Sequence, residues 1–497
     1  MARDRVEACF RHAAHLCARS AGTPPADPVI VAEPNDTPIA ETLPFDVVFP
    51  GDRLARTRAL LLADQPNESA AFLLAHPVAT LLGGTRLLVY DHLPVAANAY
   101  ASRSPTHVTL TPAALAAAAS RAREGGVALI VAHSHTHRGA VGPSDRDREG
   151  ETHFAPALAR RVAAPLARLI VGHDDVHAAA LTADGNASPA RVISVGRELT
   201  GISPGSARGD VPLELYDRQV RAFGAAGQAV LSRLRVGIVG LGGTGSVVAQ
   251  QLAHLGVGAL LLIDLDHLET TNLNRVVGAR PGDVGRPKVA VAEDMIRAIH
   301  PAAQVTSLVA DVQDAPTARR LLDVDCVVNC TDSHGSRAVV NQLAYQYAVP
   351  AFDLGVVIHA GHDGTGRLAG RVQMLAPGLP CLICGNVLDP EAVRRDLLSP
   401  AARAADPYVV GSLLPTPQPA VISLNSVAAS LAVTMLLAAV TDVPGIARHQ
   451  RLRLECGVVT HVEGTPQPAC PVCSSAGASG RGDAWPAPGR ALVKARR

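Results

Sequence analysis

The sequence has almost no net charge and almost no lysine. Its 497 residues include 45 basic and 44 acidic ones, for a formal net charge of +1. No overall basic field therefore indicates nucleic acid or an anionic membrane as a partner. Only Lys288 and Lys494 are lysines, and the other basic residues are arginines. A lysine kept in such a chain indicates a role that a guanidinium cannot fill.

The sequence also lacks a secretory leader and a long uninterrupted apolar run. Charged residues such as Arg3, Asp4 and Glu7 interrupt the apolar residues at the N-terminus, which a secretory signal would not tolerate. The most apolar stretch, 426–440, is about 15 residues long, short of the roughly 20 that span a bilayer. We predict a buried helix there, and we expect a cytoplasmic protein with no membrane partner.

The composition excludes a disordered chain and a disulfide framework. Apolar residues make up 48% of the chain and charged residues 18%, a balance typical of globular domains. A chain of this length predicts two or three domains. We find no internal repeat, and divide the chain into an appendage and linker (1–45), an α/β domain (46–200), a second domain (205–475) and a disordered tail (476–497). Nine cysteines in so long a chain do not indicate a secreted disulfide scaffold.

The two domains differ in their pattern of predicted elements. In the first, we predict helices over 67–82 and 112–123, and strands over 86–90, 127–132 and 168–171. In the second, strands and helices alternate. The strands are predicted within 235–240, 259–266, 324–332 and 350–356, with a helix over 242–256. This alternation predicts a Rossmann-like, doubly wound parallel sheet.

A glycine-rich turn joins the first strand and helix of the second domain. The turn contains Gly240, Gly242, Gly243 and Gly245. Glycines let the backbone approach phosphates, and the helix N-terminus supplies N–H groups and positive potential. A dinucleotide-dependent dehydrogenase has nearly the same turn, and Asp264 at the next strand end suits a ribose hydroxyl in either case.

Polar residues further along favour ATP cleavage over hydride transfer. An enzyme that cleaves ATP between its α- and β-phosphates needs cations on the triphosphate, for which Arg218, Arg275 and Lys288 are candidates. It also needs a carboxylate for Mg²⁺, for which Asp332 is a candidate. Asn272 fits as a phosphate or ribose donor. A dehydrogenase needs none of these residues.

The order GLGGTG, DLDHLETTNLNR, VGRPKV and NCTD resembles the ubiquitin-activating superfamily of ThiF, MoeB and HesA type, over about 210–475. By this resemblance, Gly243, Asp264, Asn272, Arg275, Lys288 and Asp332 bind ATP and Mg²⁺. The resemblance also implies a homodimer in which Arg218 reaches the nucleotide of the other subunit.

Two C-x-x-C pairs fit the same family. Four thiolates spaced in this way predict a structural zinc site that joins two distant segments. The proposed ligands are Cys381, Cys384, Cys470 and Cys473.

The nucleophilic cysteine that such enzymes usually carry is missing. No cysteine lies between Cys384 and Cys456. Cys456 itself falls in a predicted strand, where we expect a core residue. Ser412 and Thr416 lie in the region of the missing nucleophile, without an identifiable base. The enzyme therefore stops at the acyl-adenylate, uses an oxyester, or receives a thiol from a partner.

The first domain contains a possible metal-ligand set. His133 and His135 stand at i and i+2 at the end of a predicted strand, so they project to the same side. Asp147, a short loop later, can complete three ligands and leave an open position for water. Glu68, predicted at the start of a helix, is the candidate general base. Ser144 can donate to a tetrahedral intermediate.

This glutamate, H-S-H and S-x-x-D arrangement resembles the JAB/MPN (JAMM) metalloproteases. The resemblance implies a cytidine-deaminase-like α/β fold. It also implies zinc ligands His133, His135 and Asp147, with Glu68 as base and Ser144 as oxyanion donor. The chain has one extra residue between His135 and Ser144, which leaves room for Asp145 or His137 to compete as a ligand.

Together the two resemblances imply one enzyme with two activities. The first domain would trim or deconjugate a ubiquitin-like protein, and the second would adenylate its C-terminal glycine. Such fusions resemble those of bacterial ubiquitin-like conjugation systems, which implies a conjugating-enzyme homologue as a further partner. Two alternatives are a sulfur-carrier adenylyltransferase with a carrier-trimming domain, and a catalytically reduced assembly module. The arginine and alanine bias is compatible with a GC-rich bacterial genome.

Overall fold

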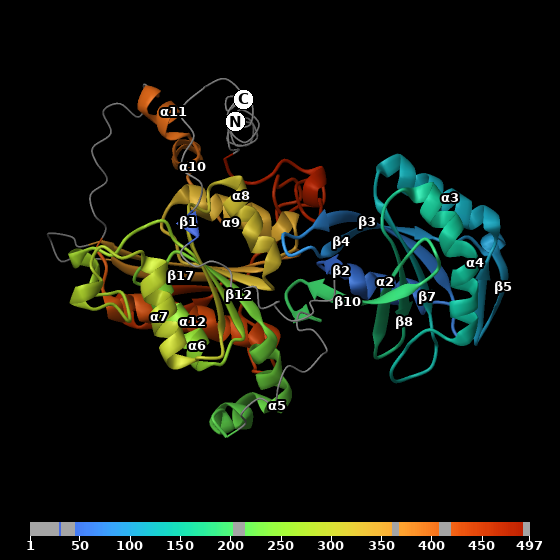
Figure 1. Ribbon diagram of the computed structural model, residues 1–497, viewed down its shortest axis with the longest axis horizontal. Coiled ribbons are helices and arrows are strands. Elements are labelled where there is room, and N and C mark those ends of the chain that lie inside the picture. The colour runs from blue at the N-terminus through green and yellow to red at the C-terminus, as the bar shows by residue number, and fades with distance from the viewer. Residues whose placement is uncertain (1–28, 31–44, 202–213, 360–366, 407–418, 491–497) are drawn as a thin grey trace.

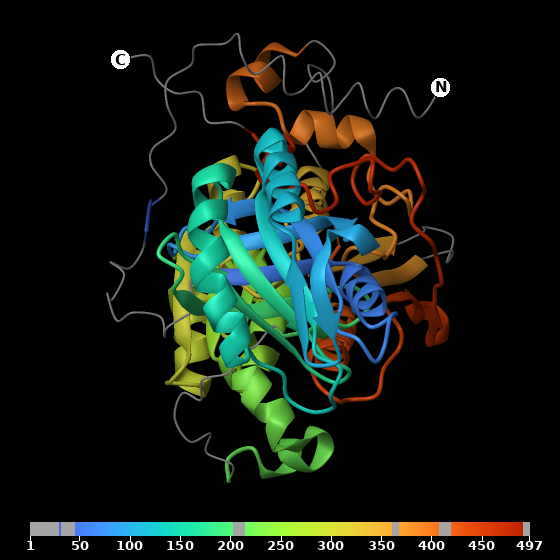
Figure 2. The ribbon, with the colours of Figure 1, turned by 90° about the vertical axis from the view of Figure 1, so that its right-hand side faces the viewer.

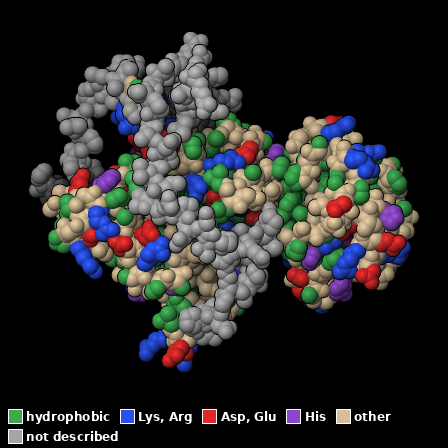
Figure 3. All heavy atoms as spheres, viewed as in Figure 1, with side chains coloured by type: hydrophobic (Ala, Val, Ile, Leu, Met, Phe, Trp, Pro, Cys, Tyr) green, Lys and Arg blue, Asp and Glu red, His purple; other side chains and the backbone are tan. Residues whose placement is uncertain are grey.

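The computed structural model describes residues 29–30, 45–201, 214–359, 367–406 and 419–490. These residues form two domains, each built around one β-sheet (Figure 1). Acidic and basic side chains are interspersed over the face shown in Figure 3. The junction predicted between the two domains, at 200–205, falls outside the described residues except for Thr200 and Gly201, as does most of the predicted appendage 1–45.

The N-terminal domain, the JAB-like half, has an eight-stranded sheet that curls back on itself. β10 pairs with β2 on one side and with β9 on the other, so the two ends of the sheet meet. In spatial order the strands are β11 (Leu199–Thr200), β10 (Ala187–Val195), β2 (Phe45–Pro50), β4 (Thr85–Pro94), β3 (Ala70–Ala79), β7 (Ala128–Ser134), β8 (Leu166–Val171) and β9 (Val176–Leu181). A separate hairpin joins β5 (Tyr100–Ser104) to β6 (His107–Leu110).

Helices cover both faces of this sheet. Leu73 on β3 packs in the cluster that contains α2 (Arg53–Leu61). Its neighbours Phe72 and Leu74 pack with α3 (Pro112–Gly125) and α4 (Asp145–Val162), which lie side by side in Figure 2. Because successive strand residues point to opposite faces, α2 and the α3–α4 pair lie on opposite sides. The helix predicted over 112–123 and the strands predicted over 86–90, 127–132 and 168–171 are confirmed.

The helix predicted over 67–82 is wrong, since residues 70–79 of this stretch form β3 instead. The apolar run is buried between β4 and β7, and a strand covered on both faces carries a continuous apolar run as a buried helix does. Pro77, which disfavours a helix interior, lies beyond the part of β3 that pairs with β7. Glu68 therefore precedes a strand.

The C-terminal domain has a nine-stranded sheet that is only partly parallel. In spatial order its strands are β1 (Val29–Ile30), β14 (Gln304–Val309), β13 (Ala259–Ile263), β12 (Arg235–Val239), β15 (Cys326–Asn329), β16 (Ala351–His359), β17 (Arg367–Leu375), β18 (His449–Arg453) and β19 (Val458–His461). The predicted parallel order holds from β14 to β16. The predicted parallel sheet is therefore confirmed, and β1 and β17 to β19 extend its two edges by antiparallel pairing.

Helices flank the C-terminal sheet on both sides, as a doubly wound fold requires. In Figure 1, α6, α7 and α12 lie on one side and α8 and α9 on the other. The helices of this domain are α5 (Asp217–Arg233), α6 (Gly245–His254), α7 (Lys288–Ile299), α8 (Ala315–Arg319), α9 (His334–Gln346), α10 (Pro390–Asp396), α11 (Pro400–Ala405) and α12 (Ile422–Val440).

The apolar stretch predicted as a helix over 426–440 forms α12, which is longer than expected. Among the described residues α12 is the one helix whose length and composition would suit a membrane span. A core helix passes the same test, and α12 packs against α6, β16 and β17. Eight of its side chains are buried.

Residues 475–490, which we name the C-terminal segment, overlap the disordered tail predicted over 476–497, and that prediction is wrong for residues 476–490. Gln346 on α9 donates to the carbonyls of Gly482 and Trp485 at 2.8 and 3.1 Å. Asp483 forms an ion pair with Arg319 at 2.7 Å. Arg490 binds the carboxylates of Asp311 and Asp314. The composition resembles a disordered tail, but these long-range contacts hold the segment in place.

The two domains share a buried interface. Val48, Val78 and Leu88 of the N-terminal sheet lie in the same apolar cluster as the core of the C-terminal domain. A Cβ on Gly482 would lie 2.6 Å from Val78, so the C-terminal segment also packs on this face. Polar contacts cross the interface as well. Arg191 pairs with Asp46 of its own domain at 2.7 Å and with Asp325 of the other at 3.6 Å.

Candidate functional site

The end of β7 brings two histidines and one aspartate together. The Nε2 atoms of His133 and His135 lie 3.3 Å apart, and each lies 3.3 Å from a carboxylate oxygen of Asp147. Both histidines are buried. Burial would raise the pKa of Asp147, but hydrogen bonds from the two histidines outweigh it and hold this pKa well below its usual range. Two imidazole nitrogens and an ionised carboxylate, all within 4.8 Å of one another, fit a zinc ion with an open coordination position.

Glu68 lies beside this cluster and is almost fully buried. Ala70 pairs with His133 across antiparallel strands, which places Glu68 opposite the His135 end of β7. Burial raises the pKa of Glu68, and the neighbouring histidines oppose this shift. A carboxylate with a raised pKa is suited to accept a proton near neutral pH and return it.

Three further residues fix the backbone around Glu68, and the sequence patterns did not single them out. Ser134, fully buried between the two histidines, accepts from the Ser69 backbone N–H at 2.9 Å. The hydroxyl of Tyr100 accepts from the Ala70 N–H at 3.2 Å, and the Ser104 carbonyl accepts from the Glu68 N–H at 2.9 Å. Ser134 could have been found as the central residue of the H-S-H motif.

Ser144 caps α4 and contacts Asp147. Its hydroxyl accepts from the Asp147 N–H at 3.2 Å and donates to the Asp147 carboxylate at 2.7 Å. In the structure this serine therefore orients a candidate metal ligand. Neither competing ligand joins the cluster: Asp145 is exposed and pairs with Arg148, and His137, whose ring lies 5.6 Å from that of His135, contacts the Ala140 carbonyl.

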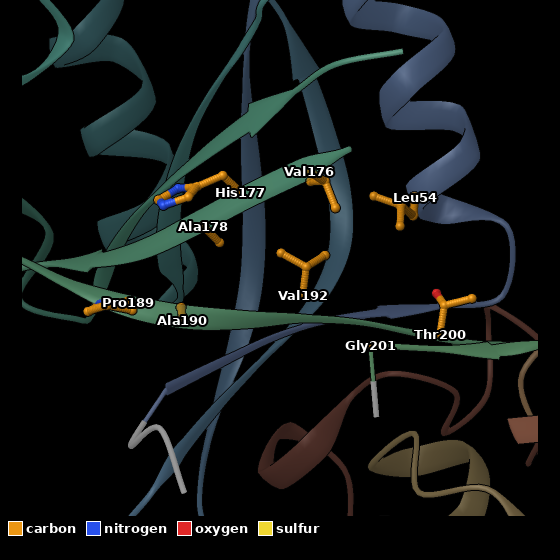
Figure 4. Close-up of a pocket in the computed structure, with 9 residues that line it drawn as sticks. All are labelled: Leu54, Val176, His177, Ala178, Pro189, Ala190, Val192, Thr200 and Gly201. Carbon is orange, nitrogen blue, oxygen red and sulfur yellow. The ribbon is translucent and has the colours of Figure 1, made fainter. Parts of the chain in front are cut away.

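A hollow of about 400 Å³ lies between α2, β9 and β10 (Figure 4). It is lined by Leu54, Val176, Val192 and other residues outside both candidate sites. His177 is the one titratable lining residue, and burial lowers its pKa. A neutral imidazole without a nucleophile or acid beside it gives this hollow no evident chemistry.

The glycine loop after β12 is shaped for close approach of a ligand. Gly240 has φ +86°, and a Cβ there would lie 3.1 Å from Thr331. A Cβ on Gly245 would lie 1.8 Å from the Gly240 carbonyl, and one on Gly243 would lie 2.3 Å from Asn425. A Cβ on Gly242 would meet nothing within 4 Å, so the protein leaves open space beside this backbone. Such a loop at the N-terminus of α6 fits phosphate groups.

Charged residues surround the loop. The Asp264 carboxylate accepts from the Leu241 N–H at 2.6 Å, and burial raises its pKa while Lys288 opposes the shift. Lys288, the first residue of α7, places Nζ 2.7 Å from the Asp266 carboxylate. Arg275 lies close enough to Gly243 that a Cβ there would be 3.3 Å from its Cδ.

The remaining predicted nucleotide residues differ in position. Asp332 is exposed directly after β15, next to the residues that touch Gly240. Asn272 lies in a short turn, where its side chain accepts from the Glu269 N–H at 3.2 Å. Arg218 lies in the first turn of α5, exposed and without a contact to the loop among the described residues. The structure therefore gathers the loop, Asp264, Lys288, Arg275 and Asp332, but not Arg218.

The four paired cysteines meet as predicted. The Sγ atoms of Cys381 and Cys470 lie 3.5 Å apart, and those of Cys384 and Cys473 lie 3.4 Å apart. All four sulfurs lie within 4.8 Å of one another. This donor set fits a closed tetrahedral zinc site that ties the loop after β17 to the residues just before the C-terminal segment.

Purified protein is expected to contain two zinc ions per chain, one for each donor set. Mild chelation should remove the ion of the histidine site first, because that site keeps an open position. Metal analysis of Cys381→Ser should show one zinc lost together with folding of the C-terminal domain. A single zinc in the wild type, unchanged in His133→Ala, would contradict the histidine site.

Two cysteines outside the four-cysteine cluster differ in their suitability as a thiol nucleophile. Cys456 lies in an exposed turn between β18 and β19, so its prediction as a core residue of a strand is wrong. Cys330 lies beside Gly240, but burial raises the pKa of its thiol. Ser412 and Thr416 fall outside the described residues.

Comparisons with known proteins define the class of each half. The sequence model of the ThiF family matches residues 216–469, more than half of the chain. The model of prokaryotic homologs of the JAB domain matches residues 52–181. The chain belongs to the ThiF family and carries a JAB domain before the family's own domain.

The chain matches individual relatives over only part of their length. The molybdopterin-synthase adenylyltransferase of Escherichia coli is 35% identical over 173 residues, which cover 34% of this chain and 66% of that protein. The SAMP-activating enzyme E1 of Haloferax volcanii is 31% identical over 182 residues, covering 36% and 63%. The chain thus spans slightly less than two thirds of either relative. A crystal structure of E. coli MccB with MccA-N7isoASN shares 21% identity at a TM-score of 0.43, covering 53% of this chain and 77% of that one.

Proposed function

We propose that this chain trims or deconjugates a ubiquitin-like protein with its JAB domain and adenylates the exposed C-terminal glycine with its ThiF domain. The observation that carries the proposal is that one chain holds both sites in assembled form. Glu68 stands beside the histidine–aspartate cluster, and Lys288, Arg275 and Asp264 surround the glycine loop. We further propose that the enzyme acts in the cytoplasm with ATP, Mg²⁺ and zinc.

In the proposed peptidase half, His133, His135 and Asp147 would hold zinc. When bound, the ion supplies a Lewis acid and lowers the pKa of a coordinated water to about 7. Glu68 would accept the proton of that water and deliver it to the leaving amine. Ser144 would stabilise the oxyanion once its hydroxyl turns from the Asp147 carboxylate.

In the proposed adenylation half, a carboxylate oxygen of the terminal glycine attacks the α-phosphorus of ATP. A bond forms between that oxygen and phosphorus, and the bond to the leaving pyrophosphate breaks. N–H groups of the glycine loop and the cations Lys288 and Arg275 would stabilise the charge that develops on the phosphates. Asp332 would hold Mg²⁺, which neutralises part of that charge.

The position of Arg218 supports a homodimer. α5 projects away from the rest of the domain in Figure 1, and Leu215 just before it is 71% exposed. α12 also exposes Ile422 and Val427. Exposed apolar residues, and an arginine with no ion pair within the described part of the chain, suit a second copy of the chain, to whose nucleotide Arg218 would reach.

Two alternative functions remain. One would yield a different final product, and the other would involve no catalysis. A sulfur-carrier adenylyltransferase is supported by the likeness to molybdopterin-synthase adenylyltransferase, and its product would be a thiocarboxylate. A catalytically reduced module is disfavoured by the open cradle at Gly242 and the buried, oriented Glu68. A conjugating-enzyme homologue is proposed as a further partner for the conjugation route only.

The proposal can be tested by incubating the wild type with a ubiquitin-like protein that ends in glycine and is encoded by a neighbouring gene. We expect ATP–pyrophosphate exchange with the mature protein, and exchange with a version extended by a few residues only after cleavage seen by mass spectrometry. When a sulfide donor is added, displacement of AMP from the acyl-adenylate to give a thiocarboxylate would favour the sulfur-carrier alternative. Absence of exchange with the mature protein would contradict the adenylation claim.

A further inference from the structure

A buried carboxylate lies behind the loop that carries Asp332. Asp353 on β16 is fully buried and stands directly across from Asn329 at the end of β15. Its Oδ1 accepts from the Asn329 side-chain amide at 2.7 Å. Its Oδ2 binds the guanidinium of Arg371 on β17, and Arg337 Nε on α9 lies 3.8 Å from its Oδ1. One acid thus joins three secondary-structure elements around the end of the parallel sheet.

The partners of Asp353 in turn hold Thr331, the residue before Asp332. The Thr331 hydroxyl donates to the Asn329 side-chain oxygen at 3.1 Å. Arg337 Nε donates to the Thr331 carbonyl at 3.1 Å. Both the side chain and the backbone of Thr331 are therefore fixed by groups that bind Asp353.

The fold keeps space for this arrangement. A Cβ on Gly355 would lie 2.5 Å from the guanidinium of Arg337, so a larger residue there would push that side chain from its present position. Arg337 also donates to the Leu354 carbonyl at 3.4 Å. Two guanidiniums that are mostly buried need a nearby negative charge, and Asp353 is the carboxylate that both approach.

We propose that Asp353 is a positioning residue for Mg²⁺ binding by Asp332. The inference rests on the proposed function, since it assumes that Asp332 holds the metal of ATP. An exposed carboxylate on a free loop would lose conformational entropy each time it bound an ion. The contacts from Asp353 through Asn329 and Arg337 to Thr331 order the loop beforehand, which should raise the affinity for Mg²⁺·ATP.

Calorimetry of ATP binding, with Mg²⁺ and with EDTA, tests the role of Asp353. The quantity of interest is the gain in ATP affinity that Mg²⁺ gives over EDTA. In Asp353→Asn this gain should fall on the order of tenfold, while the affinity for ATP in EDTA stays near that of the wild type. Thr331→Val, which keeps the shape and removes one hydroxyl, should lower the same gain roughly threefold to tenfold. A merely structural role would weaken ATP binding equally under both conditions.

Asp325→Asn is the matched control. Asp325 is also buried and also binds arginines, Arg191 and Arg235, but it lies at the opposite end of β15. Its substitution should lower stability without changing the Mg²⁺ dependence. Asp332→Ala is expected to remove the gain in ATP affinity that Mg²⁺ gives. If it does, and if Thr331→Val and a folded Asp353→Asn both keep that gain, the positioning role is wrong. If Asp332→Ala keeps the gain, Asp332 is not the metal residue and the proposed function itself needs revision.

Discussion

Glu68→Ala is expected to lower cleavage of an extended ubiquitin-like protein by roughly 10²- to 10⁴-fold, the usual contribution of a general base. Zinc content should not change, because Glu68 lies beside the donor set without belonging to it. Cleavage is measured by mass spectrometry and zinc by metal analysis. Adenylation of the mature protein should persist, since that site lies in the other domain.

Two further variants serve as comparisons for Glu68→Ala. His135→Ala should lose both cleavage and the zinc of the histidine site, because it removes a candidate ligand. Glu149→Ala, an exposed acid on α4, should keep both. Normal cleavage by Glu68→Ala would show that another group is the base. A wild type that holds its second zinc yet cleaves nothing would make the site structural.

Lys288→Ala and Asp332→Ala are each expected to slow ATP–pyrophosphate exchange about 10²- to 10³-fold, as loss of a group that stabilises transition-state charge does. Lys288→Arg should restore little of the exchange activity. The Lys288 side chain is confined, with 13% of it exposed, and a planar guanidinium would replace a compact ammonium group. Exchange is measured with labelled pyrophosphate and a mature, glycine-ended ubiquitin-like protein.

Arg297→Ala serves as the control for Lys288. It lies on the same helix, α7, and its half-exposed side chain pairs with Glu293. Exchange should stay within about twofold of the wild type, as for other exposed surface pairs. Equal exchange by wild type, Lys288→Ala and Asp332→Ala would overturn the assignment of the adenylation site.

Local sequence patterns predicted the parts of both sites that are close in sequence or fixed by a motif. The glycine loop, the i and i+2 histidines and the two cysteine pairs occur where expected, because their spacing alone determines their geometry. The same reasoning could not choose between Asp145 and Asp147. The capping of α4 by Ser144 decides that choice, since it turns Asp147 inward and leaves Asp145 exposed.

Features that depend on distant partners could not be predicted. Residues 70–79 are a strand because β4 and β7 flank them, which no local pattern shows. Asp353 gains its neighbours from β15, β17 and α9, up to 24 residues away in sequence. The C-terminal segment has the composition of a flexible tail, yet contacts over more than a hundred residues fix it.

The path of the C-terminal segment links a metal site to the relation between two domains. It begins directly after Cys473, follows α9 through Gln346, and packs at Gly482 against Val78 of the JAB domain. Zinc at the four cysteines would therefore strengthen the contact between the domains as well as the fold of one of them. With that contact fixed, the two reaction centres keep a constant separation. For the proposed sequence of reactions, the tail of a ubiquitin-like protein would then pass between two sites whose relative position the C-terminal segment helps to hold.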